Sequence, residues 1–493
     1  MNTVIEHRAG LDVHKASVMA TASMAQGGDE TRTYPTMASS LIVLRDWLLE
    51  QGITHVALEA TGVYWKPIWA VFEGHFKQML LVNPRHMKNV PGRKTDVKDS
   101  QWIHQLLGAG LLQGSFVPTK EIRDLREPTR YRKALIGEKT RTVNRLHKAL
   151  EHVGIKLDCV VSDIQGKAAR RILDAIVQGM TDPEKLSRLG GKRLRATPQE
   201  LCNALDGYVE PMHSKMIGSI LMHIDALNQE IKEFDDMIEK QTDPYESYLK
   251  LIRSVPGVGE RTAQNILAEI GTDISRWPTA KHFASWAGVC PGNHESAGKT
   301  RSGKTRRGPK HLNNALHDAA MAASVQKGTY LYAQYRRLLP KKGHKRALGA
   351  VKHSIVVSLW YMLTNGEMYV DLGEDYFRKR DPERLTRHLV AQLELLGHKV
   401  ILEPAQPEPT EPESVQPELA QSVQPEPESV QPELESVQQE TVQPEWPEWP
   451  ESESKTPEPA HPKPELADLV PNAHQSRSTV HVLQTTGRVP HTQ

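Results

Sequence analysis

The sequence predicts an α/β domain at the N-terminus, a mainly helical remainder and a long acidic tail. Strand-like and helical runs alternate over residues 1–118, which is typical of an α/β domain with a mixed sheet. From Ile217 to Ile238, apolar residues recur at steps of three and four, which indicates a long helix. From residue 403, five near-copies of SVQPE, rich in Pro, Glu and Gln, predict disorder because they contain too few apolar residues to form a core.

The predicted elements of the first domain follow a simple order. Short apolar runs of strand length are separated by amphipathic stretches with 3.6-residue spacing. In order, they are a strand over 16–22, a helix over 39–50, a strand in HVALEA that ends at Glu59, a helix near 65–72, a strand at MLLV and a helix that contains Asp96 and Asp99.

Four acidic residues stand at the edges of these elements: Asp12, Glu59, Asp96 and Asp99. Taken singly, a surface carboxylate is usually only a solvated charge, and the pair at 96 and 99 could simply favour the start of a helix capped by Thr95. Because a spacing of three places that pair on one helix face, and the other two acids end strands, all four can converge. Clustered carboxylates repel unless a divalent cation joins them, so we predict a Mg²⁺-dependent nucleic-acid enzyme.

Charge separates the chain into two parts. The 493 residues carry a net charge of only +2, but residues 403–468 contain seventeen acids and two lysines, a net charge of −15, which leaves +17 on the rest. A basic body predicts a polyanionic partner, and the acidic tail could compete for the same surface. The three cysteines are far apart and lack CxxC spacing, and the longest apolar stretch is about half a membrane span. We therefore expect a cytosolic protein with no membrane partner.

A basic helix is predicted over about 129–153, where cations surround an apolar stripe. We predict that it follows a phosphate backbone, with Arg141 and Arg145 as contacts, although a solvated helix face is the alternative. The apolar seam from Ile217 to Ile238 favours self-association into a dimer or tetramer through a coiled coil. Pairing within the chain, against the basic helix, is the alternative.

Two further motifs predict nucleic-acid contact. The stretch 251–271 has a helix-hairpin-helix pattern in which Gly257 and Gly259 allow close approach to a phosphate, although such a motif can also be a packing corner. Within 283–320, a flexible basic loop contains Ser296, a candidate nucleophile, although most loop serines are inert. Its predicted phosphate contacts are Lys299, Arg301, Lys304, Arg306 and Arg307, and Lys94 beside the acidic pair is another.

Five motifs together resemble the DEDD-type insertion-sequence transposases, whose first domain is similar to the RuvC Holliday-junction resolvase. They are GLDVHK, EATGVYW, KTDVKDS, VPGVG and AGVCPGNHESAGKTRSGKTRRG, in the family's order over residues 8–365. Pro128 departs from the family, where the basic helix is usually unbroken, so we expect that helix to begin at or just before it. Ser100 stands where a small apolar residue is common and remains compatible with a helix. The acidic tail has no counterpart in the family.

The resemblance implies an RNase H fold, with Asp12, Glu59, Asp96 and Asp99 as the DEDD set that binds Mg²⁺. It also implies that Ser296 attacks the DNA phosphate and forms a phosphoserine link, at a site shared between protomers, and that a structured RNA guides the recombinase. A junction-resolving nuclease that uses water and a non-catalytic DNA- or RNA-binding protein are the alternatives. The expected parts are a RuvC-like domain (1–118), a basic helix with coiled coil (119–245), a serine transposase domain (246–385), a linker (386–402) and the tail (403–493).

Overall fold

A computed structural model describes most of the chain up to residue 402. The described residues are 5–84, 87, 99–191, 194–292, 294–296, 299–302, 305–380 and 382–402, and the side chains of 294–296 and 299–302 are not described. Three predicted site residues, Lys94, Asp96 and Lys304, lie outside the described residues. The acidic tail, 403–493, lies outside them too.

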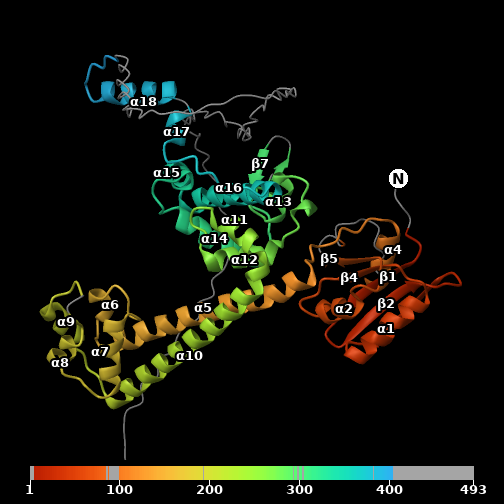
Figure 1. The fold of residues 1–493 in the computed structure, drawn as a ribbon, viewed down its shortest axis with the longest axis horizontal. Helices are drawn as coiled ribbons and strands as arrows, with labels where there is room; N and C mark the ends of the chain where they lie inside the picture. Colours follow the sequence, from red (N-terminus) through yellow and green to blue (C-terminus); the bar gives the residue numbers. More distant parts are fainter. Residues whose placement is uncertain are drawn as a thin grey trace, which may run out of the picture. The chain divides into compact units, whose positions relative to one another are not determined.

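The N-terminal domain is built on a mixed sheet, as predicted, and this sheet has five strands (Figure 1). The strand order is β3-β2-β1-β4-β5, in which β1–β2 and β2–β3 pair antiparallel and β1–β4 and β4–β5 pair parallel. The five strands are β1 (Arg8–Val13), β2 (Ser17–Ser23), β3 (Asp29–Pro35), β4 (His55–Glu59) and β5 (Gln78–Val82).

Helices cover both faces of the sheet, because alternate side chains of each strand point to opposite faces. Leu11 and Leu58 pack with α1 (Ala38–Glu50) and α2 (Trp65–Phe72) on one face. On the other face, Ala57 packs with Ile103 and Leu107 of α4 (Asp99–Gly108). The predicted helices at 39–50 and 65–72 are confirmed.

Two predictions about these strands are wrong. The only strand expected near Asp12 was 16–22, but a separate strand, β1, comes before it and contains Asp12 near its end. The edge strand β3, DETRTYP, was not predicted because it is polar and lacks the apolar alternation of a half-buried strand.

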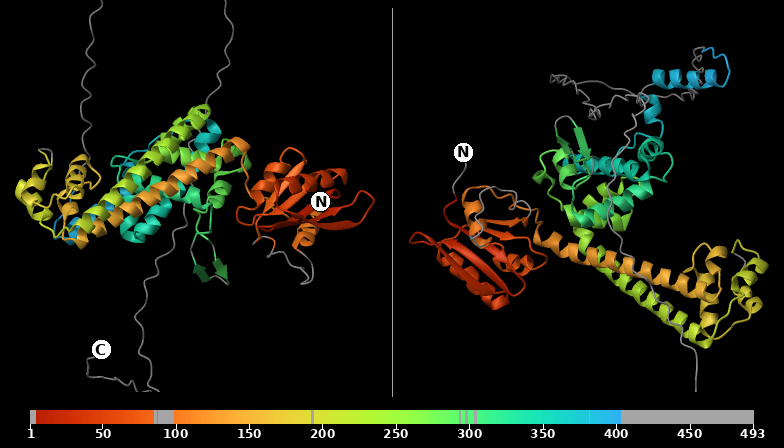
Figure 2. Two further views of the ribbon diagram at one scale, coloured as in Figure 1. Left: turned by 90° about the horizontal axis from the view of Figure 1, so that it is seen from below. Right: turned by 180° about the vertical axis from the view of Figure 1, so that it is seen from behind.

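Two long helices, α5 (Lys120–His152) and α10 (Pro211–Thr242), lie side by side (Figure 2). Ile217, Ile224 and Leu227 of the apolar seam are buried, and they pack in clusters with Leu135 and Leu146 of α5. The favoured prediction, self-association through this seam, is therefore corrected to the alternative pairing within one chain.

The start of α5 is also corrected. It begins at Lys120, eight residues before Pro128, which lies inside the helix and is buried. A proline inside a helix removes one backbone donor, here the partner of the Asp124 carbonyl four residues earlier, and leaves the other backbone donors of the helix available. The helix therefore continues through the proline.

Four short helices pack against the C-terminal half of α5 and the N-terminal half of α10. Apolar residues from all of these elements form one buried cluster. The short helices are α6 (Leu157–Val160), α7 (Lys167–Val177), α8 (Pro183–Arg188) and α9 (Pro198–Leu205).

The C-terminal helices of the described chain surround a second large core. They are α11 (Glu246–Arg253), α12 (Glu260–Ile270), α13 (Ala280–Trp286), α14 (Lys310–Ala323), α15 (Tyr330–Lys342) and α16 (His344–Asn365). By length and composition alone, α16 could cross a membrane, but its residues Val351, Ile355 and Leu359 are buried in this core. We interpret α16 as a core helix.

Two shorter segments complete the described chain. The predicted basic loop contains a two-stranded hairpin, β6 (His294–Ser296) and β7 (Lys299–Ser302). After α17 (Tyr376–Lys379), helix α18 (Pro382–Leu395) occupies much of the region that we predicted as a linker from residue 386. Helix α18 has no buried residues, and the domain boundaries stay a prediction.

Candidate functional site

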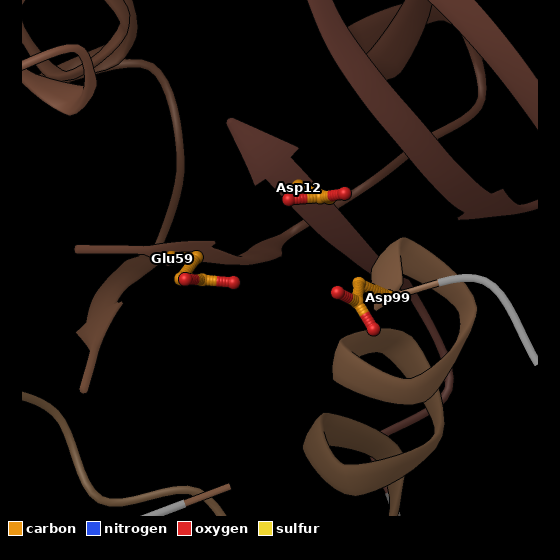
Figure 3. A group of neighbouring side chains, drawn as sticks. All are labelled: Asp12, Glu59 and Asp99. Carbon is orange, nitrogen blue, oxygen red and sulfur yellow. The ribbon is translucent and has the colours of Figure 1, made fainter. Parts of the chain in front are cut away.

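Three of the four predicted acids meet at one end of the sheet (Figure 3). Oxygen atoms of Asp12, Glu59 and Asp99 all lie within 4.8 Å of one another. Asp12 comes from β1, Glu59 from β4 and Asp99 from the start of α4. The fourth predicted acid, Asp96, lies outside the described residues.

The parallel register of β1 and β4 places the first two acids beside each other. Leu11 is paired with Leu58, so the next residue on each strand, Asp12 and Glu59, reaches the same level. Leu11 and Leu58 point into the core under α1 and α2. Because successive side chains alternate, both carboxylates point to the opposite face, which α4 covers.

A glycine in β1 sets the distance between α4 and the sheet. A Cβ atom placed on Gly10 would lie 2.4 Å from the backbone nitrogen of His104 and 2.5 Å from the carbonyl oxygen of Ser100. These separations are shorter than any van der Waals contact, so α4 can lie this close to β1 only at glycine. Gly10 is two residues from Asp12, so the same contact brings the start of α4, with Asp99, to the acids of the sheet.

Buried hydrogen bonds hold α4 in this position. The hydroxyls of Ser100 and Thr21 lie 2.9 Å apart, and Thr21 is a further 2.9 Å from the hydroxyl of Thr31. One turn later, His104 Nε2 lies 3.0 Å from the hydroxyl of Ser23. Ser100 is fully buried, so its hydroxyl has a structural role that the sequence analysis did not assign.

The environment of Asp12 opposes its negative charge. Only 7% of the residue is exposed, and burial raises the pKa of Asp12 above its usual value. The neighbouring charge of Asp99 raises this pKa further, whereas His14, whose Nε2 lies 3.1 Å from Asp12 Oδ2, lowers it. Thr61 donates its hydroxyl to Glu59 at 2.9 Å and thereby orients the second carboxylate.

These residues fit a divalent cation. A half-buried set of oxygen donors from two aspartates and one glutamate is the ligand type that Mg²⁺ prefers. Their oxygen atoms lie within 4.8 Å of one another, so all three carboxylates could ligate one such ion after side-chain rotation.

We predict a pH-dependent loss of stability from His104. This side chain is 1% exposed, and burial followed by the charge of Arg8 lowers the pKa of His104 to about 4, from 6.5. The unfolded chain therefore takes up a proton at a higher pH than the folded chain does. Stability from the neutral imidazole is complete above pH 6.5 and is lost as the pH falls towards 4, by about 3 kcal/mol at most.

Urea unfolding at several pH values checks this prediction. The parent should lose more stability between pH 6.5 and 4 than a His104→Gln variant, in which the amide can still meet Ser23. Replacement of the exposed His75 by Gln is the matched control and should leave the parent's pH dependence unchanged. Equal pH profiles for the parent and His104→Gln would contradict it.

The predicted serine lies in a β-hairpin. Ser296 ends β6 and is paired with Lys299 of β7, the strand that also contains Arg301. Arg306 and Arg307 follow the hairpin and are exposed. Their roles as nucleophile and phosphate contacts stay predictions.

The two glycines of the helix-hairpin-helix pattern have different surroundings. Gly257 has a positive φ of 87°, and an added Cβ would lie 2.5 Å from the backbone nitrogen of Ala323 in α14. Its close approach is therefore to another helix, which is the packing alternative. Gly259 has no atom within 4 Å of its Cβ position, so the start of α12 is open on that side.

Several cations of α5 form hydrogen bonds or ion pairs with other side chains of the protein. Arg130 forms two hydrogen bonds with the carboxylate of Glu269, Lys133 pairs with Asp318, and Arg132 is buried with Asp235 and Gln264. These three cations therefore have partners inside the protein, and the phosphate-backbone role of this helix stays a prediction. Farther along α5, the predicted contacts Arg141 and Arg145 are exposed.

Sequence reasoning missed Gly10 and His14 as parts of the site. A glycine inside a strand is a known signal for close backbone approach, and His14 stands two residues after Asp12 in GLDVHK. Both signals are visible in the sequence, but only the folded chain shows that Gly10 contacts α4 and that His14 contacts Asp12.

Comparisons with known proteins agree with this geometry. A family model of the DEDD IS110 type, described as a transposase, matches residues 9–155. A second, described as the transposase IS116/IS110/IS902 family, matches residues 249–336. The first match includes Asp12, Glu59 and Asp99, and the second includes Ser296.

Curated relatives agree with the family models. The transposase for insertion sequence element IS1111A of Coxiella burnetii is 22% identical over 321 residues, 64% of this chain and 79% of that protein. An uncharacterised 44.8 kDa protein of insertion element IS116 from Streptomyces clavuligerus is 24% identical over 393 residues, 73% of this chain and 95% of that protein. The pilin gene-inverting protein of Moraxella bovis is 30% identical over 111 residues, 22% of this chain and 32% of that protein.

The fold, the acidic centre and these matches define a transposase, an enzyme of DNA recombination. Over residues 9–155 and 249–336, the chain is similar to the IS110/IS116 family of transposases.

Proposed function

We propose that this transposase mobilises an insertion sequence by Mg²⁺-dependent cleavage and exchange of DNA strands. The observation that carries the proposal is the meeting of Asp12, Glu59 and Asp99 from three separate elements. Asp96 is proposed as the fourth ligand because it precedes Asp99 by three residues in the sequence. When bound, Mg²⁺ would neutralise charge on the scissile phosphate and so make it easier to attack.

Ser296 is the proposed nucleophile. Its hydroxyl oxygen forms a bond to phosphorus and gives up its proton, while the bond from phosphorus to one deoxyribose oxygen breaks. That oxygen leaves with the bonding electrons and is protonated, so a phosphoserine link and a free sugar hydroxyl result. Lys299, Arg301, Lys304, Arg306 and Arg307 are proposed to hold the phosphate, and their concentration near one serine supports this role.

The proposed function also implies nucleic-acid partners, an oligomeric state and a cellular location. We propose DNA at Arg141, Arg145 and the start of α12, a structured guide RNA as a second partner, and a dimer or tetramer in the bacterial cytoplasm, associated with the nucleoid. The strongly basic part of the chain before the tail supports a nucleic-acid partner. The seam of α10 no longer supports the oligomer, because α5 covers it.

Replacement of Ser296 by Ala tests the nucleophile. We expect the variant to lose all covalent protein–DNA adduct, which denaturing gels of the parent with labelled element-end DNA should reveal. Mg²⁺ binding should be unchanged, because the carboxylates are intact. Ser302→Ala, in the same hairpin, is the matched control and should still form the adduct.

The same experiment separates the main alternative. If Ser296→Ala cleaves DNA at the parent's rate, water is the nucleophile and the chain acts as a junction-resolving nuclease. If the parent neither cleaves DNA nor forms an adduct with Mg²⁺ present, the non-catalytic alternative is favoured.

A further inference from the structure

The hairpin between α15 and α16 is a strongly basic surface whose exposed cations have no carboxylate partners among the described residues. Residues 330–366 contain seven lysines and arginines and no acidic residue. Arg336, Lys341, Lys342, Lys345 and Arg346 are exposed, and within the described residues none of these five forms an ion pair. By contrast, Arg130, Arg132 and Lys133 of α5 all have carboxylate partners.

The hairpin has a defined geometry. Gly343 ends α15 with a φ of 76° and directly precedes α16. Its nitrogen donates to Leu339 at 3.0 Å, and its carbonyl accepts from Ala347 at 3.0 Å. The hydroxyl of Tyr335 lies 2.7 Å from His344 Nδ1 and ties the two helices together across the turn. The cations on both sides of Gly343 are therefore held on one compact corner.

The helix dipoles favour the cations on one side of Gly343 but not those on the other side. Lys341 and Lys342 end α15, where cations suit the negative end of the helix. Lys345 and Arg346 occupy the first turn of α16, where the free N–H groups already form a positive end. This turn contains no acidic residue and has no side-chain cap, so its charge distribution disfavours the helix unless an anion lies against it.

We propose that this hairpin, through Lys341, Lys342, Lys345 and Arg346, binds the phosphate backbone of a nucleic acid. These four cations lie beyond the end of the second family match at residue 336 and are not part of the acidic centre. The arrangement suits phosphates rather than bases, because flexible cations and helix N–H groups contact backbone oxygens without sequence preference. Phosphate binding by this hairpin does not depend on the proposed function. The proposed function enters only in the choice of nucleic acid, which is DNA or structured RNA.

Binding by the full-length protein in EDTA tests the proposal. We compare the parent with a variant in which all four cations become Gln, using labelled duplex DNA and a labelled RNA hairpin over a range of salt concentrations. Each lost phosphate contact lowers the salt slope for duplex DNA by about 0.9, so the slope should fall by about 3 to 4 and the affinity at least about 10-fold at 0.1 M salt. The larger loss on DNA or on RNA identifies the source.

The control variant removes the same charge elsewhere. Lys185, Lys215, Lys232 and Lys240 are exposed, and their replacement by Gln should leave most of the salt slope intact. The hairpin variant should unfold at about the same temperature as the parent, because it removes unfavourable cations at the start of α16 and favourable cations at the end of α15. If the variant lost binding because it misfolded, its unfolding temperature would fall below that of the parent. In that case the single variants Lys345→Gln and Arg346→Gln decide, and each should lower the salt slope of binding by about 0.9.

Two results would overturn the proposal. One is a parent-like slope on both nucleic acids, or a reduction no larger than that of the control. The other is tighter binding by the hairpin variant, which would indicate that the acidic tail, rather than nucleic acid, occupies the hairpin. Because EDTA removes Mg²⁺ and no cleavage is measured, a failure of the proposed chemistry does not affect either result.

Discussion

Asp12→Asn and Asp99→Asn variants should lose Mg²⁺ binding and DNA strand cleavage while they keep the fold. Each change removes one of three converging carboxylates, so the remaining pair cannot complete the ligand set. Outer-shell partners of metal sites typically contribute about 10–100-fold, so loss of a direct ligand should reduce cleavage by more than about 100-fold. Isothermal titration with Mg²⁺ and a cleavage assay measure the two effects separately.

A stability measurement distinguishes a metal ligand from a merely structural acid. The raised pKa of Asp12 means that the folded chain holds this proton to a higher pH than the unfolded chain does. Its contribution to stability is therefore complete below 3.8 and is lost as the pH rises through the raised folded value. At neutral pH without metal, Asp12→Asn should be more stable than the parent, and added Mg²⁺ should stabilise only the parent.

Asp46→Asn is the matched control, because Asp46 is exposed on α1 and contacts only its neighbour Arg45 among the described pairs. It should behave as the parent in all three assays. Mg²⁺ affinity within about twofold of the parent in Asp12→Asn would sink the assignment of this residue as a ligand, since loss of a direct ligand costs far more.

Gly10→Ala should disrupt the same centre without touching any carboxylate. The new Cβ would meet backbone atoms of α4 at 2.4 and 2.5 Å, and backbone atoms cannot rotate away, so the helix must shift. Overpacking of this kind costs about 1–3 kcal/mol. A shift of about 1 Å at Asp99 should also lower cleavage about 100-fold, because catalytic groups tolerate little displacement.

Urea unfolding, Mg²⁺ titration and the cleavage assay check the effect of Gly10→Ala. Gly349→Ala is the control, since Gly349 lies in α16 with nothing within 4 Å of its Cβ position. It should be neutral or stabilise by about 0.5–1 kcal/mol, because alanine is the better helix former. If Gly10→Ala bound Mg²⁺ and cleaved DNA as the parent does, the distance between α4 and β1 would not control the centre.

The success of the sequence predictions followed the strength of local patterns. Helices α1 and α2 and strand β4 were placed to within about a residue, because apolar periodicity and turn residues are local properties. Strand β3 was missed because an edge strand can be polar and is recognised only by its pairing with β2. Helix α18 was missed because it lies next to the tail, where we expected a connection, although Leu385, Leu389 and Val390 have helical spacing.

The sequence by itself determined the acidic set, the basic body and the resemblance to a transposase family, because these depend on residue identity and on spacing along the chain. Only the tertiary structure decided which groups meet. The register of β1 and β4 aligns Asp12 with Glu59, and Gly10 allows α4 to bring Asp99 to them. In the same way, α5 covers the seam of α10, and three of its cations pair with acids of the same chain, whereas the cations of the α15–α16 hairpin stay exposed. Periodicity predicts that a helix face is apolar or charged. Contacts between residues far apart in the chain determine which element packs against that face.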